Sequence, residues 1–317
     1  MPTDADARSL ERVWRPDWPC PVPRILGTFR HGGGDPTYRV DADHTIWRAL
    51  RTPAGPATVA TRPMDRAGEV HATAWGPGAD WALDRLPATC GADDDPSGFQ
   101  PRHEVLARSW ATHPHFRVPR SGLVLESLVP AVIEQKVTGN EAFGSWRRLV
   151  WRFGAPAPGS QAASRRLMLP PSPERLRAIP SWTWLQMHVD PAHSRTLVTV
   201  AGSARALERL VDLSWAEADR RLRSLPGVGV WTSAEVRQRA LGDPDAISFG
   251  DYHVAKDVTW ALTGRAQDDA AMEQLLEPYV GHRFRVQVLV GLGGMRRPRR
   301  APRMTLPTHL PSTVGRR

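Results

Sequence analysis

Asp251 is a candidate for chemistry: it follows Gly250 and stands directly before an apolar stretch with helical spacing, a position that by itself is more often an ordinary helix N-cap. A carboxylate at the N-terminus of a helix is stabilised in its charged form by the helix dipole. A charged carboxylate can stabilise positive charge in a transition state, and it can orient or deprotonate a water molecule. An aspartate in this place is also an ordinary helix N-cap, and the two interpretations are compatible.

The second chemical feature is the hairpin Leu225-Pro226-Gly227-Val228-Gly229, which ends one helix and opens the next. Proline prevents the first helix from continuing, and glycine allows a tight turn and a close approach of the backbone to a ligand. The free N–H groups at the start of the next helix form a phosphate site, which reads DNA backbone and not sequence. A plain corner between two helices is the alternative. The residues that we expect to contact DNA are Gly227, Val228, Gly229, Val230 and Thr232.

Helical patterns that could position both features run through residues 101–295. Apolar residues fall on one helical face in four stretches, 124–133, 142–153, 197–207 and 254–262. Pro130 lies inside the first stretch and should kink it. Thr138 and Glu141 have the spacing of a capping box, and Asp190 before a proline is a good helix start.

Residues 1–100 have a different pattern, with short, partly alternating segments between glycine, proline and aspartate turns. This pattern predicts an antiparallel sheet with strands at 38–40, 45–50, 58–60 and 70–75. A short helix should follow Gly78, and the acidic stretch 91–98 resembles a linker. We therefore predict an α+β protein with a β-rich N-terminal domain (1–100), an all-helical hairpin domain (101–295) and a basic, Pro-rich tail (296–317).

Composition restricts the possible partners. The net charge of +9 favours a polyanion, and arginine, which supplies nearly all of the basic charge, suits phosphate. Codon bias in a GC-rich genome is the alternative source of the arginines. Two cysteines are too few for an iron–sulfur cluster or a four-cysteine zinc site, and they predict a reducing compartment. The N-terminus lacks the apolar core of a signal peptide and no apolar run is long enough to span a membrane, so we expect a cytoplasmic protein.

The hairpin and the segment around Asp251 together resemble the helix-hairpin-helix DNA glycosylase superfamily, which places its catalytic aspartate a short distance after the hairpin. Residues 131–138 are similar to an upstream helix of that superfamily, and residues 276–283 to its final Pro-containing helix. A β-rich domain before the helical core resembles the DNA-3-methyladenine glycosylase II family. The resemblance covers roughly residues 20–295.

The resemblance implies roles for individual residues. Asp251 would be the catalytic carboxylate. Trp231 stands where bifunctional members carry a Schiff-base lysine, and its indole would line the base pocket and stack on a cationic purine, unless it is a plain core residue. Lys136 aligns with the residue that fills the gap left by a flipped base, although a solvated lysine is an equal alternative. The remaining expected pocket residues are Glu235, Tyr252 and Leu276, and the first and last stand where this family often has aromatic residues.

The function implied by the resemblance is monofunctional excision of alkylated purines, such as 3-methyladenine, in base excision repair. The partner would be double-stranded damaged DNA, with the target nucleotide flipped out of the duplex. A glycosylase for another damaged base and a non-catalytic DNA-binding protein are the alternatives. We expect a nucleoid-associated monomer without a cofactor, and we leave open a monovalent cation at the hairpin.

Overall fold

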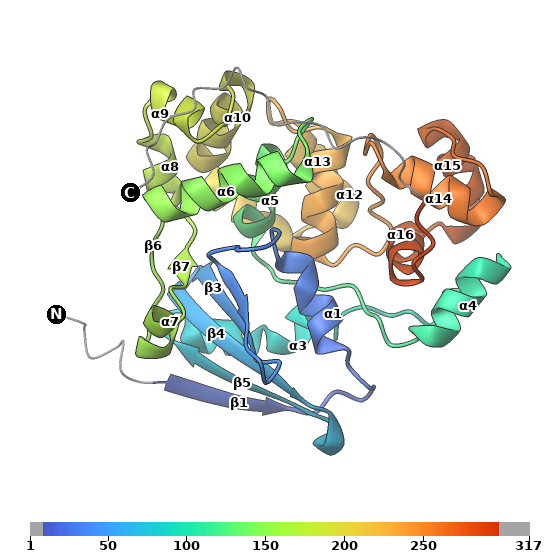
Figure 1. Cartoon of the computed structure of the whole chain (residues 1–317), viewed down its shortest axis with the longest axis horizontal. Coiled ribbons are helices and arrows are strands. Elements are labelled where there is room, and N and C mark those ends of the chain that lie inside the picture. The colour runs from blue at the N-terminus through green and yellow to red at the C-terminus, as the bar shows by residue number, and fades with distance from the viewer. Residues whose placement is uncertain (1–8, 298–317) are drawn as a thin grey trace.

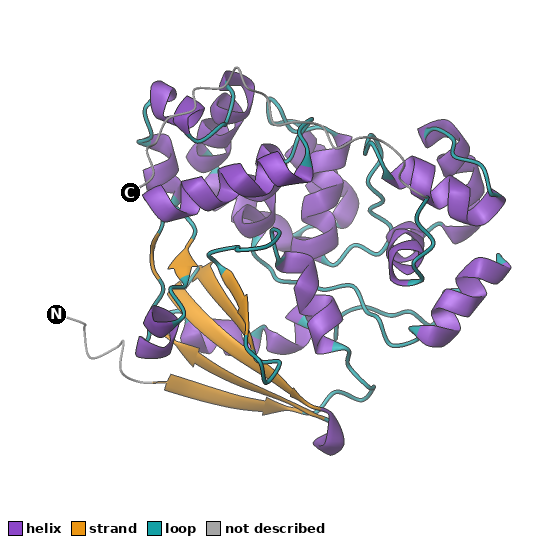
Figure 2. Ribbon diagram, viewed as in Figure 1, coloured by secondary structure: helices purple, strands orange, loops and turns teal. Residues whose placement is uncertain are grey.

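The computed structural model describes residues 9–297 and places a five-stranded antiparallel sheet beside a larger helical region (Figures 1 and 2). The five strands have the order β1-β5-β4-β3-β2. Their bounds are β1 (Ser9–Trp14), β2 (Tyr38–Val40), β3 (Ile46–Thr52), β4 (Gly55–Met64) and β5 (Glu69–Trp75). All of the neighbouring strands pair antiparallel. The expected strands are therefore present, and β1 is an additional edge strand.

Both faces of the sheet are covered. One face shares a core with three short helices, α1 (Val22–Leu26), α2 (Ala79–Asp84) and α3 (Leu86–Thr89). On the other face, Trp47 stacks on Trp75 with ring centroids 5.4 Å apart. These two residues pack against a segment that returns from the helical region and comprises β6 (Ala155–Pro156), α7 (Ser160–Ser164) and β7 (Met168–Leu169). This segment lies in the Pro-rich connection, for which the sequence predicted no element.

The helical region begins at α4 and has two separate cores. The first core unites α5 (Val124–Ile133), α6 (Gly139–Phe153), α8 (Pro173–Arg177), α9 (Ser181–Gln186), α10 (Pro191–Gly202), α11 (Ala204–Glu208), α12 (Trp215–Arg223) and α13 (Val230–Val236). The second core unites α4 (Glu104–Thr112), α14 (Val254–Thr263), α15 (Asp269–Leu276) and α16 (Arg283–Leu292). The chain leaves the first core after Leu241 and enters the second at Ile247, and Asp251 follows directly before α14.

Local signals in the sequence account for several helix starts. Thr138 and Glu141 form the expected capping box, and the side chain of Asp190 accepts hydrogen bonds from the backbone at the start of α10. The predicted α+β class, with an N-terminal sheet followed by helices, is confirmed. Of the expected basic tail, only residues 296 and 297 fall inside the described residues. Within residues 9–297, no helix is long and apolar enough to cross a membrane.

Candidate active site and DNA-binding hairpin

The two glycines of the hairpin have different structural roles. Gly227 has a φ of +86°, which side chains rarely adopt, and a Cβ atom there would lie 2.0 Å from Thr196 Oγ1 on α10. Glycine is therefore required at this position by both the turn and the packing. Gly229 has a φ of −97° and open space where a Cβ would be. The exposed backbone at Gly229 is thus the part of the hairpin that a phosphate can approach closely.

Gln135, which directly precedes Lys136 and lies just after α5, holds the hairpin by two hydrogen bonds. Its Nε2 atom donates to the Gly227 carbonyl oxygen at 2.9 Å and to Thr232 Oγ1 at 2.7 Å. Thr232 is only 2% exposed, and Val228 is also buried. The side chains of Val228 and Thr232 therefore position the hairpin, and contact of these two residues with DNA through their backbone stays a prediction. Gly227, Gly229 and Val230 are exposed, as a DNA-binding surface requires.

Lys136 lies in the turn between α5 and α6 and is exposed. Its φ of +52° is unusual for a residue with a side chain. The turn therefore presents the lysine outward, beside the residue that holds the hairpin. Insertion of this side chain into DNA stays a prediction.

Asp251 is held by three N–H donors from two helices. Its Oδ1 atom accepts from the backbone nitrogens of His253 at 2.7 Å and Val254 at 3.0 Å, which caps α14. Its Oδ2 atom accepts from the indole Nε1 of Trp231 at 3.1 Å, on α13. The carboxylate is half-buried, so it combines a fixed orientation with access from outside. Capping is thus compatible with the expected chemical role of Asp251, which stays a prediction.

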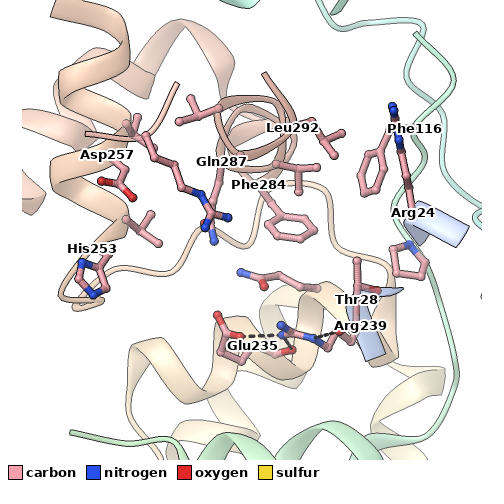
Figure 3. Close-up of a pocket in the computed structure, with 18 residues that line it drawn as sticks. Arg24, Thr28, Phe116, Glu235, Arg239, His253, Asp257, Phe284, Gln287 and Leu292 are labelled. Carbon is pink, nitrogen blue, oxygen red and sulfur yellow. Dashed lines mark hydrogen bonds and ion pairs between the residues drawn. The ribbon is translucent and has the colours of Figure 1, made fainter. Parts of the chain in front are cut away.

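A cavity of about 420 Å³ opens at the start of α14. His253 and Val254, whose backbone N–H groups bind Asp251, are among its lining residues, whereas Asp251 itself is not. Figure 3 shows Glu235 and Arg239 on one side of the cavity, with Phe284 and Gln287 facing them. A cavity of this size falls within the range of small-molecule sites.

Glu235 is 8% exposed and faces the cavity with both oxygens partly engaged. Oε1 accepts from Ser248 Oγ at 2.6 Å, and Oε2 accepts from Arg239 Nη1 at 2.7 Å. Burial disfavours the charged form of Arg239, but the carboxylates of Glu235 and Glu134 outweigh it and raise the pKa of the guanidinium. The cavity therefore contains a charged acceptor and a charged donor side by side.

Of the four expected pocket residues, Glu235 alone lines this cavity. Leu276 is 0% exposed and belongs to the second helical core, so its assignment to the pocket is wrong. Tyr252 is 72% exposed, and Lys256 Nζ lies 3.8 Å from its ring centroid, so this ring is on the surface. Trp231 does not line the cavity, and its indole N–H binds Asp251 instead.

Several lining residues were missed by sequence reasoning. Arg24 and Thr28 come from the N-terminal region, Phe116 from the segment between α4 and α5, and Phe284 from α16. No local motif marks them, since they meet only in the folded chain. Arg239 had a signal, because it follows Glu235 by four residues and such residues share a helix face.

Within residues 9–297, no group of three or more His, Cys, Asp or Glu side chains could hold a metal ion. The Gly227 carbonyl is already engaged by Gln135, and a monovalent cation at the hairpin stays a prediction.

Comparison with known proteins gives the fold a context. No family model matches the chain. Over 140 residues, or 44% of this chain, it is 33% identical to the "Probable bifunctional transcriptional activator/DNA repair enzyme AlkA" of Mycobacterium tuberculosis. The matched part spans only 27% of that relative's length.

Solved structures match over most of the chain. A 3-methyladenine DNA glycosylase from Archaeoglobus fulgidus superposes with a TM-score of 0.67 at 18% identity, covering 89% of this chain and 97% of that one. An 8-oxoguanine glycosylase/lyase from Clostridium acetobutylicum, solved with double-stranded DNA, gives a TM-score of 0.65 at 11% identity, covering 90% and 96%. The chain therefore has the fold of these DNA glycosylases, and part of it is similar in sequence to a DNA repair enzyme.

Proposed function

We propose that this protein is a monofunctional DNA glycosylase that hydrolyses the N-glycosidic bond of alkylated purines in double-stranded DNA. The observation that carries the proposal is the Asp251 carboxylate, which is fixed by Trp231 and by the backbone of His253 and Val254, two residues that line a base-sized cavity. The relative from M. tuberculosis is described as a DNA repair enzyme, and the structural neighbour from A. fulgidus as a 3-methyladenine DNA glycosylase. Both descriptions agree with this chemistry.

In the proposed mechanism, the exposed backbone at Gly229 and the start of α13 bind phosphate, and the target nucleotide rotates out of the duplex. The base enters the cavity, which leaves its sugar beside Asp251. As the bond between C1′ and the base nitrogen breaks, positive charge develops on the sugar and the carboxylate stabilises it. Water then adds its oxygen to C1′ and loses a proton, and the products are the free base and an abasic site.

An alkylated purine suits a site with one catalytic carboxylate. The alkyl group gives the ring a positive charge, so the base departs as a neutral molecule when it takes the bonding electron pair. Little further activation of the leaving group is needed. We propose that the protein acts as a monomer and without a cofactor.

The substitution Asp251→Asn tests the proposal, because it keeps the size of the side chain and most of the capping but removes the charge. We expect the rate of base release from methylated duplex DNA to fall at least about a hundredfold, the usual effect of one lost transition-state electrostatic contact. Released bases are identified by mass. DNA affinity should persist. Full activity of a folded Asp251→Asn protein would remove this residue from the mechanism.

If the wild-type protein binds duplex DNA but releases no base from methylated DNA, a non-catalytic DNA-binding role replaces the proposal. If the protein releases another damaged base and no alkylated purine, the proposed reaction holds but the proposed substrate is wrong.

A further inference from the structure

The ion pair between Glu235 and Arg239 has no part in the bond cleavage proposed above, yet both residues face the cavity (Figure 3). The oxygens of Glu235 each accept one hydrogen bond, from Ser248 and from Arg239. A carboxylate oxygen has two lone pairs, so each oxygen can accept one more. Arg239 uses Nε for the Thr28 carbonyl and Nη1 for Glu235, and within residues 9–297 its Nη2 atom has no hydrogen bond.

The pair is held in place from behind. Ser248, which binds Glu235, is fully buried. Gln238 Nε2 donates to Ser248 Oγ at 2.9 Å, and Gln287 Nε2 donates to the same atom at 3.2 Å. Such a buried network fixes the orientation of its members. Glu235 and Arg239 therefore present acceptors and a donor to the cavity in a fixed arrangement, as a specificity site requires.

We propose that Glu235 and Arg239 read the Watson–Crick edge of a guanine-type base, so that N7-alkylated guanine is the preferred substrate. This inference rests on the proposed glycosylase function. The Watson–Crick edge of guanine carries one acceptor, O6, next to two donors, N1–H and the N2 amino group. Arg239 Nη2 would donate to O6, and the two oxygens of Glu235 would accept from N1–H and N2–H.

Adenine-type bases satisfy this pair less completely. Their edge has an amino donor at N6 and no N2 amino group, so it brings the carboxylate one donor where guanine brings two. A polar group left unpaired in a closed site costs binding free energy. Alkylation of guanine at N7 leaves the Watson–Crick edge intact, and the positive charge that it adds to the ring strengthens the N–H donors. Phe116 and Phe284 offer aromatic contacts in the same cavity.

The test measures single-turnover release by the full chain from duplexes that carry one N7-methylguanine or one N3-methyladenine, each corrected for spontaneous loss. Glu235→Gln should lower the N7-methylguanine rate about tenfold, which equals roughly one net hydrogen bond, and should change the N3-methyladenine rate much less. A third duplex with N7-methylhypoxanthine, which lacks the N2 amino group, should react more slowly than N7-methylguanine in the wild type. Glu235→Gln should reduce that difference.

The matched control is Glu104→Gln, which alters another Glu–Arg pair of spacing i,i+4, exposed on α4 and outside the cavity lining. It should leave the ratio of the rates unchanged. Arg239→Lys keeps the charge but loses the planar fork, and it should also lower the preference for N7-methylguanine. Thermal denaturation verifies that each variant is folded.

Equal effects of Glu235→Gln on both bases, or an unchanged ratio, would overturn the inference while leaving the glycosylase function intact. A wild-type protein that prefers N3-methyladenine would also overturn it. If the wild type releases no alkylated base, the proposed function itself fails.

Discussion

The indole nitrogen of Trp231 donates a hydrogen bond to Asp251 Oδ2 over 3.1 Å, and this bond joins the first helix after the hairpin to the start of α14. The other carboxylate oxygen, Oδ1, is fixed by the backbone of α14. The Trp231 bond therefore fixes the second carboxylate oxygen relative to α13, the helix that follows the hairpin. We therefore expect Trp231 to be a positioning residue for Asp251.

Trp231→Phe removes the N–H group and keeps an aromatic ring, so it tests this positioning. A hydrogen bond to a charged group contributes about 1.5–3 kcal/mol, and we expect the single-turnover rate to fall about tenfold or more. In an Asp251→Asn background, Trp231→Phe should have little further effect, because the two residues act together. Trp182→Phe is the control, since Trp182 is exposed on α9. If the losses in rate were additive in the double variant, Trp231 and Asp251 would act independently.

The two hairpin glycines should respond differently to alanine. Gly229→Ala meets no atom within 4 Å and has an ordinary φ, so its free energy of unfolding should change by no more than about 0.5 kcal/mol. Affinity for all duplexes should fall, because the new methyl group keeps phosphate away from the backbone. Gly227→Ala should also destabilise the fold by about 1–3 kcal/mol through its positive φ, and its clash with Thr196 adds to this.

Urea unfolding and salt titrations of DNA binding measure these effects. Affinity of the wild type should decrease steeply with salt through counterion release. If Gly229→Ala binds DNA as tightly as the wild type over the titration, the exposed backbone at this position is not the DNA anchor.

Lys136 can be tested with two substitutions that both remove its side chain. If the Lys136 side chain fills the gap that a flipped base leaves in the duplex, Lys136→Ala should slow base release from paired DNA more than from single strands. The reason is that flipping costs a few kcal/mol mainly in paired DNA. Lys136→Gly should give the same result and relieve the strain of the φ of +52°. If base release slowed equally on paired and single-stranded DNA, Lys136 would contact only phosphate. If Lys136→Gly alone restored the rate, the cause would be the strained backbone and not the lost side chain.

A buried ion pair connects the cavity wall to the segment after α3. Asp94 binds Arg285 Nη2 at 2.7 and 2.8 Å, with both side chains almost fully buried, and Arg285 Nη1 donates to the Phe116 carbonyl. Asp94→Ala leaves a buried unpaired charge and should lower the free energy of unfolding by about 3–5 kcal/mol. Asp93→Ala removes a neighbouring, half-exposed pair with Arg120 and should cost no more than about 1 kcal/mol. Similar losses in urea unfolding for both variants would contradict this ranking.

The sequence predicted the parts of the site that depend on neighbouring residues. The hairpin, the helix that follows it and the place of Asp251 before α14 all come from local spacing of proline, glycine and apolar residues. The edge strand β1 was missed because its sequence, SLERVW, has charged residues in the middle, as an exposed edge permits.

The cavity could not be predicted in the same way, because contacts between distant residues create it. Arg239 reaches the Thr28 carbonyl across 211 residues, and Arg285 meets Asp94 across 191. The assignment of Leu276 to the pocket failed for the same reason, since alignment alone does not show that its side chain turns into the second core. Asp94 was placed in a linker because acidic, glycine-containing sequences are usually exposed, whereas here an arginine partner compensates its burial.

The last prediction is that cleavage leaves an intact strand with an abasic site. A lyase needs an amine that attacks C1′, and the chain has only two lysines. Lys136 belongs to the turn after α5, and Lys256 Nζ lies over the ring of Tyr252 on the surface. The residue bonded to Asp251 at the usual lysine position is Trp231, whose indole cannot form a Schiff base.

We therefore expect no covalent adduct when the protein is mixed with lesion-bearing DNA and borohydride, and no strand cleavage without alkali. Free base should still appear in the same mixture, which shows that the enzyme is active. An adduct that forms with the wild type and disappears in Lys256→Ala would make this a bifunctional lyase. An adduct that persists in that variant and disappears in Lys136→Ala would assign the amine to the turn beside the hairpin. Either result would replace water as the nucleophile at C1′.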